Sequence, residues 1–138
     1  MSKNNMETHK LSNGFISEEI VRAYATYLIV RGDAEKALSM LSIYYRIITP
    51  RIRIGLPKKH SKALGCYDPV KKTICLRSSE EYRNPFVILH EYYHHLRNSR
   101  REYLGNEKYA DRYALKSIMY FKELLRTSIR LDKVFNSL

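Results

Sequence analysis

The chain has 138 residues, of which 44% are hydrophobic and 28% are charged, and its net charge of +11 corresponds to a pI near 9.7. A chain of this length forms one domain with its own core, and it has little room for a second active module. No apolar stretch approaches the roughly 20 residues needed to span a bilayer, which argues against an integral membrane protein. No secretory signal is recognisable at the start, so we expect a cytoplasmic protein.

Residues 1–14 are polar and are expected to form a flexible N-terminal arm, and residues 15–138 are expected to form a single domain. Ser17, followed by two glutamates, is typical of a helix start, and Gly32 is typical of a helix end, so a first helix is predicted over about 17–31. A second helix is predicted over about 33–47. Apolar residues recur at helical spacing in both, which predicts a helical hairpin.

A small sheet is predicted next. Residues 51–54 alternate between charged and apolar as a short strand does, and residues 62–67 and 72–76 bracket an Asp-Pro turn and are predicted to form a β-hairpin. Cys66 and Cys75 lie symmetrically about this turn and are expected to face each other across the strands. A disulfide and a pair of buried thiols are both compatible with that position.

The pentapeptide His90-Glu91-Tyr92-Tyr93-His94 is the most informative motif of the chain. Residues four apart lie on the same face of a helix, so two imidazoles can bind one metal ion at zinc–nitrogen distances of about 2.0–2.1 Å. The glutamate lies about a quarter turn to the side, where its carboxylate can take a proton from an attacking water without binding the ion.

The flanking residues predict that this motif is helical and buried. Asn84 is a typical N-cap, Pro85 is typical of the first helical position, and an apolar run of four residues leads into the motif. The longer HExxHxxGxxH pattern of the metzincins is excluded, because Arg97 and Arg100 occupy the positions of its glycine and third histidine.

A catalytic zinc site needs a third protein ligand. Gly105 and Asn106 predict a break and a new helix start, and this helix begins with Glu107 and continues through Asp111 on the same face. Glu107 is the expected third ligand, with Glu102 and Asp111 as alternatives.

Glu107, Ala110, Asp111 and Ala114 match position by position the pattern ExxA(D/N)xxA, which commonly completes HExxH in the gluzincins. The chain therefore resembles this family of zinc peptidases over about residues 60–120. The similarity is greatest to the small soluble minigluzincins and to the catalytic cores of HtpX-type and CAAX-protease-type peptidases. It implies an α+β, minimal zincin-like domain with an N-terminal helical hairpin, a small sheet, an HExxH helix and a following helix that carries the third ligand.

The resemblance also implies roles for individual residues. One zinc ion would be held by His90, His94 and Glu107, with Glu91 as general base. Asp111 would accept a hydrogen bond from a ligating imidazole and fix its tautomer. His95 lies about 100° around the helix from the second ligand and is expected to be structural.

Zincin-like folds bind extended substrate along an edge strand of the sheet, and Thr73–Leu76 is the expected edge strand because it shortly precedes the HExxH helix. Some minigluzincins are kept latent by a terminal segment lying in the cleft. The tail after Lys122 has three alternatives here: it extends the last helix, docks as a small extra helix, or blocks the site with Asp132 as a fourth ligand.

The predicted function is that of a zinc-dependent endopeptidase acting on protein or peptide substrates. The group that stabilises the oxyanion is left open among the tyrosines, His60 and the arginines. The alternative is a noncatalytic, zinc-stabilised binding module with a basic surface for nucleic acid or another polyanion. Basic residues cluster around positions 51–62 and 97–101, but neither cluster forms a recognisable nucleic-acid-binding motif.

Overall fold

A computed structural model describes residues 8–11 and 14–137 of the chain. The described part is an α+β structure with four α-helices and a three-stranded sheet, in agreement with the predicted class. The helices are α1 (Glu18–Val30), α2 (Ala34–Tyr45), α3 (Pro85–Ser99) and α4 (Glu107–Asn136). The strands are β1 (Thr8–Leu11), β2 (Gly14–Ser17), β3 (Arg51–Ile54), β4 (Gly65–Asp68) and β5 (Thr73–Leu76).

Helices α1 and α2 form the predicted hairpin. The Ser17 hydroxyl accepts a hydrogen bond of 3.2 Å from the Ile20 N–H at the start of α1, and Gly32 follows its end with φ of 95°. Helix α2 ends at Tyr45, two residues before the predicted end. Arg46 adopts a left-handed conformation there with φ of 60°, and an arginine in that role carries none of the sequence signal that a glycine would.

The sheet contains the predicted hairpin but in a different position from the one expected. Strand β5 lies between β3, to which it is parallel, and β4, to which it is antiparallel. The expectation that Thr73–Leu76 forms the edge strand is therefore wrong. Strand β4 is the edge strand that contacts α3, so it is the edge nearest the HExxH motif.

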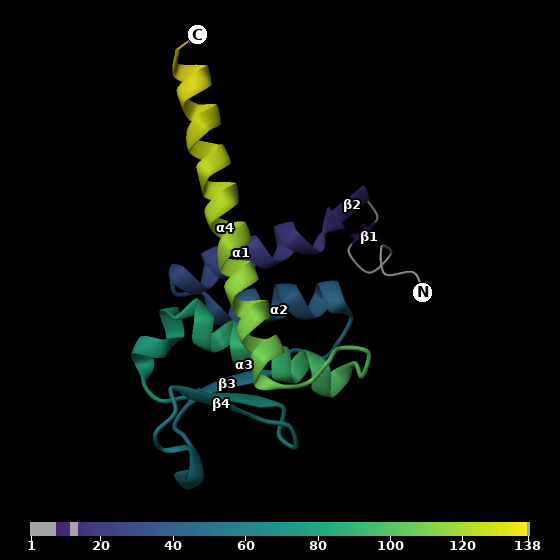
Figure 1. Ribbon diagram of the computed structural model, residues 1–138, viewed down its shortest axis with the longest axis vertical. Helices are drawn as coiled ribbons and strands as arrows, with labels where there is room; N and C mark the ends of the chain where they lie inside the picture. The colour runs from purple at the N-terminus through teal and green to yellow at the C-terminus, as the bar shows by residue number, and fades with distance from the viewer. Residues whose placement is uncertain (1–7, 12–13, 138) are drawn as a thin grey trace.

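Helix α3 is the central element of the fold. It lies between the sheet on one side and the other helices on the opposite side (Figure 1), and it contacts β4, β5, α1, α2 and α4. The core that surrounds it is continuous from the helical hairpin to the sheet. Its largest fully buried apolar side chains are Ile29, Leu38, Leu41, Tyr45, Ile74, Leu76, Ile88, Leu89, Tyr92 and Leu96.

Helix α4 begins next to α3, and its C-terminal half projects beyond α1, away from the sheet (Figure 1). Of the three alternatives for the tail, the structure therefore has the extension of the last helix. At 1.5 Å per residue, Asp132 lies about 37 Å along the helix from Glu107. In this structure Asp132 is not a fourth ligand, and the tail does not block the cleft.

Most of the expected N-terminal arm, namely residues 1–7 and 12–13, lies outside the described residues. Strand β1, in the arm, pairs antiparallel with β2, which follows the arm. Among the residues that the structure describes, no helix combines the length and the apolar composition that crossing a membrane requires.

Candidate metal centre

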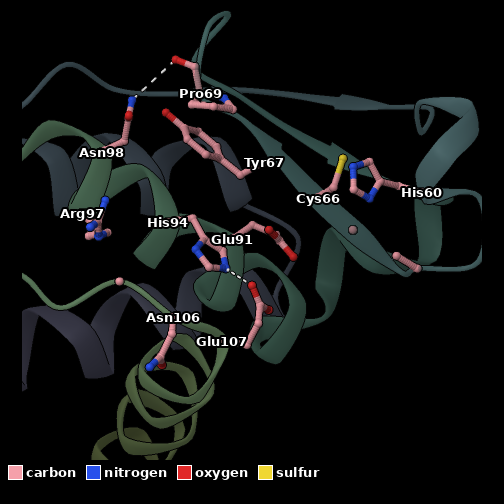
Figure 2. A pocket seen from close by; sticks show the side chains of 13 residues that line it. His60, Cys66, Tyr67, Pro69, Glu91, His94, Arg97, Asn98, Asn106 and Glu107 are labelled. Carbon is pink, nitrogen blue, oxygen red and sulfur yellow. Dashed lines mark hydrogen bonds and ion pairs between the residues drawn. The ribbon is translucent and has the colours of Figure 1, made fainter.

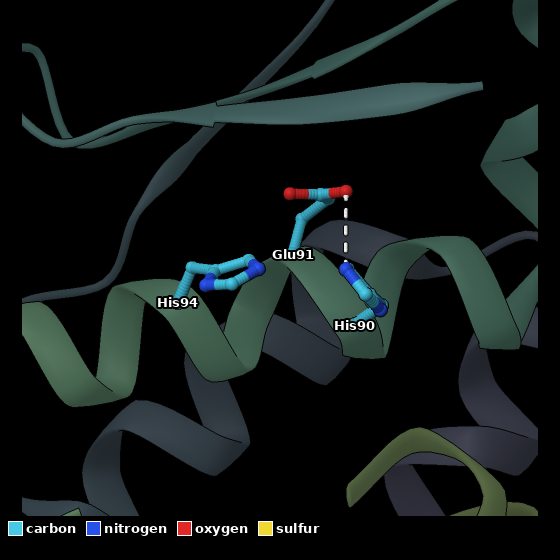
Figure 3. A group of neighbouring side chains, drawn as sticks. All are labelled: His90, Glu91 and His94. Carbon is cyan, nitrogen blue, oxygen red and sulfur yellow. Dashed lines mark ion pairs between the residues drawn. The ribbon is translucent and has the colours of Figure 1, made fainter. Parts of the chain in front are cut away.

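Helix α3 presents His90, Glu91 and His94 together, and one donor atom from each lies within 4.8 Å of the others (Figure 3). The helix starts where the sequence predicts, because the Asn84 side chain accepts a hydrogen bond of 3.3 Å from the Val87 N–H. Because their donor atoms lie so close together, His90, Glu91 and His94 could hold a metal ion.

Helix α4 brings Glu107 to the two imidazoles. The Asn106 side chain caps this helix by accepting a hydrogen bond of 3.0 Å from the Tyr109 N–H, which makes Glu107 its first residue. One carboxylate oxygen of Glu107 lies 2.7 Å from Nε2 of His90, and the other lies 3.0 Å from Nε2 of His94. Two segments separated in sequence thus meet at one point.

A buried polar network fixes α4 against the helical hairpin. Nε of Arg22, on α1, donates a hydrogen bond of 2.8 Å to the Ser117 hydroxyl, and one terminal nitrogen donates a bond of 2.8 Å to the Tyr113 carbonyl. The Tyr113 hydroxyl lies 2.9 Å from that of Tyr45 on α2, which in turn donates to Glu18 at 2.6 Å. No motif in the sequence predicts this network, which holds the middle of α4 against α1 and α2.

The close approach of α4 to α3 depends on two small residues. Ala110 and Ala114 are fully buried, so they allow the helix backbone to come close to its neighbours. The loop before α4 is tied down as well, because the Tyr93 hydroxyl donates to the Leu104 carbonyl. The burial of the two alanines and the hydrogen bond from Tyr93 thus position the start of α4.

His90 lies between two carboxylates. Its Nδ1 is 2.8 Å from Asp111 and its Nε2 is 2.7 Å from Glu107. A neutral imidazole carries only one N–H, so it can donate to only one of the two. If Nδ1 donates to Asp111, the contact between Nε2 and Glu107 joins two lone pairs and needs a cation between them, either a proton or a metal ion.

Two ligands at 2.0–2.1 Å from one tetrahedral ion are about 3.3 Å apart. Glu107 lies 2.7 Å and 3.0 Å from the two imidazoles, so its carboxylate would have to move slightly outward to share an ion with them. Of the alternatives for the third ligand, Glu102 pairs instead with Arg100 at 2.5 Å, and Asp111 contacts the opposite nitrogen of His90. Two neutral imidazoles and one carboxylate are donors that zinc accepts.

Glu91 lies beside this group but is directed toward the sheet. One oxygen is 4.0 Å from Nε2 of His90, and the side chain is only 10% exposed. Burial raises the pKa of the Glu91 carboxyl to about 7. Strand β4 approaches Glu91 closely at Gly65, where an added Cβ would lie 2.8 Å from a methyl group of Val87.

An open cleft of about 710 Å³ runs past the site between α3, β4 and the start of α4 (Figure 2). Its volume is in the range of ligand-binding pockets. His60 and Arg97 lie toward opposite ends of it, with Glu91, His94 and Glu107 between them.

His95 faces away from the cleft and is fully buried. Its Nε2 lies 2.7 Å from the Ile48 carbonyl, and its Nδ1 lies 2.6 Å from the Tyr67 hydroxyl. Since a carbonyl only accepts, Nε2 carries the proton and the Tyr67 hydroxyl donates to Nδ1. This imidazole therefore ties α3 to β4 and to the loop before β3, which is the structural position expected for it.

Comparison of the chain with protein-family models, with curated proteins and with solved structures finds no match. The resemblance to gluzincins is therefore carried by the two short motifs alone, and the function has to be argued from the site.

Proposed function

We propose that this protein is a zinc-dependent endopeptidase of the gluzincin type with a minimal zincin-like fold. The observation that supports this most is the meeting of Glu107 with both imidazoles of the HExxH motif. Beside them lies the buried carboxylate of Glu91, which lines an open cleft. A purely structural metal site does not need such a carboxylate.

His90, His94 and Glu107 would hold the ion, and zinc bound there would act as a Lewis acid that polarises the scissile carbonyl and makes water more acidic. Glu91 would take a proton from the attacking water and pass it to the leaving amine nitrogen. Its position supports this role, because one carboxylate oxygen lies 4.0 Å from Nε2 of His90 and the side chain lines the cleft.

The free edge of β4 would bind the substrate backbone. The Arg77 N–H donates to the Leu64 carbonyl at 2.8 Å, so residues 64, 66 and 68 direct their backbone polar groups toward β5. The backbone groups of Gly65 and Tyr67 consequently point outward, and within the described part of the chain no strand pairs with them. An extended peptide added there would lie alongside Glu91.

The test compares wild type with Glu91→Gln and with Glu123→Gln, a matched change at an exposed glutamate on α4. Bound zinc is measured by elemental analysis, and turnover is measured on a mixed-peptide library by mass spectrometry. We expect one zinc per chain in all three proteins. Cleavage should occur with wild type and Glu123→Gln and should fall by at least 100-fold with Glu91→Gln.

Zinc binding without cleavage in any of the three proteins would contradict the proposal. A zinc-stabilised binding module would then be the better interpretation, and its basic surface would be tested by binding to duplex DNA at low and high salt. The position of the projecting tail argues against intramolecular latency as the reason for such a result.

A further inference from the structure

Arg97 lies in the cleft one helical turn beyond His94 on α3. In the sequence it occupies the position of the metzincin glycine and belongs to the basic cluster at 97–101. In the structure it lines the cleft together with Asn98, Gly105 and Asn106, at the end opposite His60 (Figure 2).

The guanidinium of Arg97 has no partner among the residues that the structure describes. Its Nε is buried and makes no hydrogen bond, and the side chain takes part in none of the ion pairs of the described chain. Two other partly buried arginines differ. Arg100 donates to the Tyr45 carbonyl and pairs with Glu102, and Arg22 is satisfied by the buried network.

A buried donor without a partner destabilises a protein, so such a group is usually present for another reason. The loop before α4 is shaped around this one. A Cβ added to Gly105 would lie 1.6 Å from Nε of Arg97 and 2.5 Å from Cζ, so the arginine side chain occupies space that only a glycine leaves free. The loop thereby covers Nε and leaves the terminal nitrogens as the part of the guanidinium that a ligand in the cleft could reach.

The ligand that matches an unpaired guanidinium is a carboxylate, which accepts two parallel hydrogen bonds from it. The nearby carboxylate of Glu107 contacts the two imidazoles instead. The net charge of +11 also favours the approach of acidic ligands.

We propose that Arg97 forms a subsite for a carboxylate of the bound peptide, so that the cleft prefers an acidic residue, or a free C-terminus, at one position near the scissile bond. This inference rests on the proposed function, because it takes a peptide as the occupant of the cleft.

Binding is measured by calorimetry in a Glu91→Gln background, which prevents turnover. The probes are octapeptides with Glu or Gln at each successive position, each made with a free and an amidated C-terminus. We expect one Glu peptide, or the free-acid series, to bind about tenfold or more tightly than its neutral counterpart. Dependence on a Glu position identifies a side-chain carboxylate as the ligand, and dependence on the free acid identifies the C-terminus.

Four variants separate the subsite from general charge and from folding. Arg97→Gln should abolish the difference between acidic and neutral peptides, and Arg97→Lys should retain part of it. Gly105→Ala keeps the charge but displaces the guanidinium, so it should reduce the difference. Arg101→Gln removes the same charge from an exposed position and should leave the preference intact. Unchanged zinc affinity in each variant confirms an intact site.

Equal binding of acidic and neutral peptides, or a preference that survives Arg97→Gln, would overturn the inference. Cleavage by wild type without any preference for acid would leave the peptidase proposal standing and refute only the subsite. Conversely, Arg97-dependent binding without cleavage would support the subsite and contradict the peptidase.

Discussion

At the scale of single residues, the site depends on which nitrogen of His90 carries the proton. The Asp111 carboxylate lies 2.8 Å from Nδ1, and in the proposed site it would accept the proton of Nδ1 and leave the Nε2 lone pair free toward Glu107. The imidazole would then be oriented for a metal ion before the ion arrives. Helix α4 contacts His90 twice, through Glu107 and through Asp111.

Replacing Asp111 should weaken metal binding without removing a ligand. We expect zinc affinity to fall about 10- to 100-fold in Asp111→Ala and less in Asp111→Asn, because the amide oxygen still accepts from Nδ1. Affinity is measured by competition with a chromophoric chelator, and Asp132→Asn, on the exposed end of the same helix, is the control. Equal affinity in wild type and Asp111→Ala would show that His90 is held by other contacts.

Cys66 provides a second prediction at this scale. Both cysteines are free thiols, both are buried, and they face each other across β4 and β5. Burial, with the nearby Cys75, raises the pKa of the Cys66 thiol to about 11. At pH 8 the thiolate would then be only about 0.1% of the total, against about a quarter for a free cysteine.

Alkylation of Cys66 by iodoacetamide at pH 8 should therefore be at least about 100-fold slower in the folded protein than in urea. The rate should rise about tenfold per pH unit until the pKa is reached. Site-specific labelling is followed by peptide mass spectrometry. Labelling of the folded protein at the rate of a free cysteine would contradict the burial of this thiol.

At the scale of elements, the parts of the site that sequence predicts are those with local signals. The start of α3 follows from Asn84 and Pro85, and the start of α4 follows from Gly105 and Asn106, so the two helices that carry the site could be located. Both starts depend on contacts within three residues of the cap, which is why a short window suffices.

The remaining features depend on contacts between distant segments. The Asp-Pro turn predicts that residues 72–76 form one arm of a hairpin, but not that β3 pairs in parallel with Thr73–Leu76 and places it at the centre of the sheet. The missing partner of Arg97 is equally invisible in sequence, because it depends on where the acidic side chains of other elements lie. The closest sequence signal was its position three residues after His94.

The approach of β4 to α3 gives a prediction for this scale. In Gly65→Ala the new Cβ would lie 2.8 Å from a Val87 methyl group and 3.2 Å from the Cys75 carbonyl oxygen, so the strand and helix must move apart. We expect a loss of about 1–3 kcal/mol in the free energy of unfolding, measured in urea. Adding Val87→Ala removes one of the two contacts, so the double variant should lose less than the sum of the single variants.

Strict additivity of the two changes would show that the contact between Gly65 and Val87 does not limit how closely β4 approaches. The result matters for the proposed mechanism, because the same glycine lies beside Glu91 and offers its backbone groups at the free edge. Lost activity with unchanged zinc affinity would place the defect in substrate binding.

At the scale of the whole molecule, the proposed ligands come from two helices that are held together by distant contacts. An ion bound by His90, His94 and Glu107 would link α3 to α4 only in the folded state, so binding and stability are coupled. Zinc at 1,000 times its Kd should stabilise the chelator-treated protein by about 4 kcal/mol. Thermal unfolding with and without zinc measures this, and Glu107→Gln should reduce the shift. A shift unaffected by Glu107→Gln would exclude it as a ligand.

The projecting half of α4 should behave differently from the half that carries the site. Every side chain described from Lys122 to Ser137 is exposed, whereas Ala110, Ala114 and Ser117 are fully buried. A helix of this length without tertiary contacts is marginal in water. Amide hydrogen exchange should therefore be complete within minutes beyond Lys122, while the amides of the buried half should exchange close to the rate of global unfolding.

Removal of residues 123–138 tests whether the projecting half of α4 contributes to the stability of the fold. The truncated protein should keep its zinc affinity, and its melting temperature should change by no more than about 2 °C, because few stabilising contacts are lost. Protection of the projecting half that increases with protein concentration would contradict this prediction. It would mean that a second copy covers the apolar side chains exposed there, including Leu125 and Ile129, and that the helix is stabilised by association rather than by its own fold.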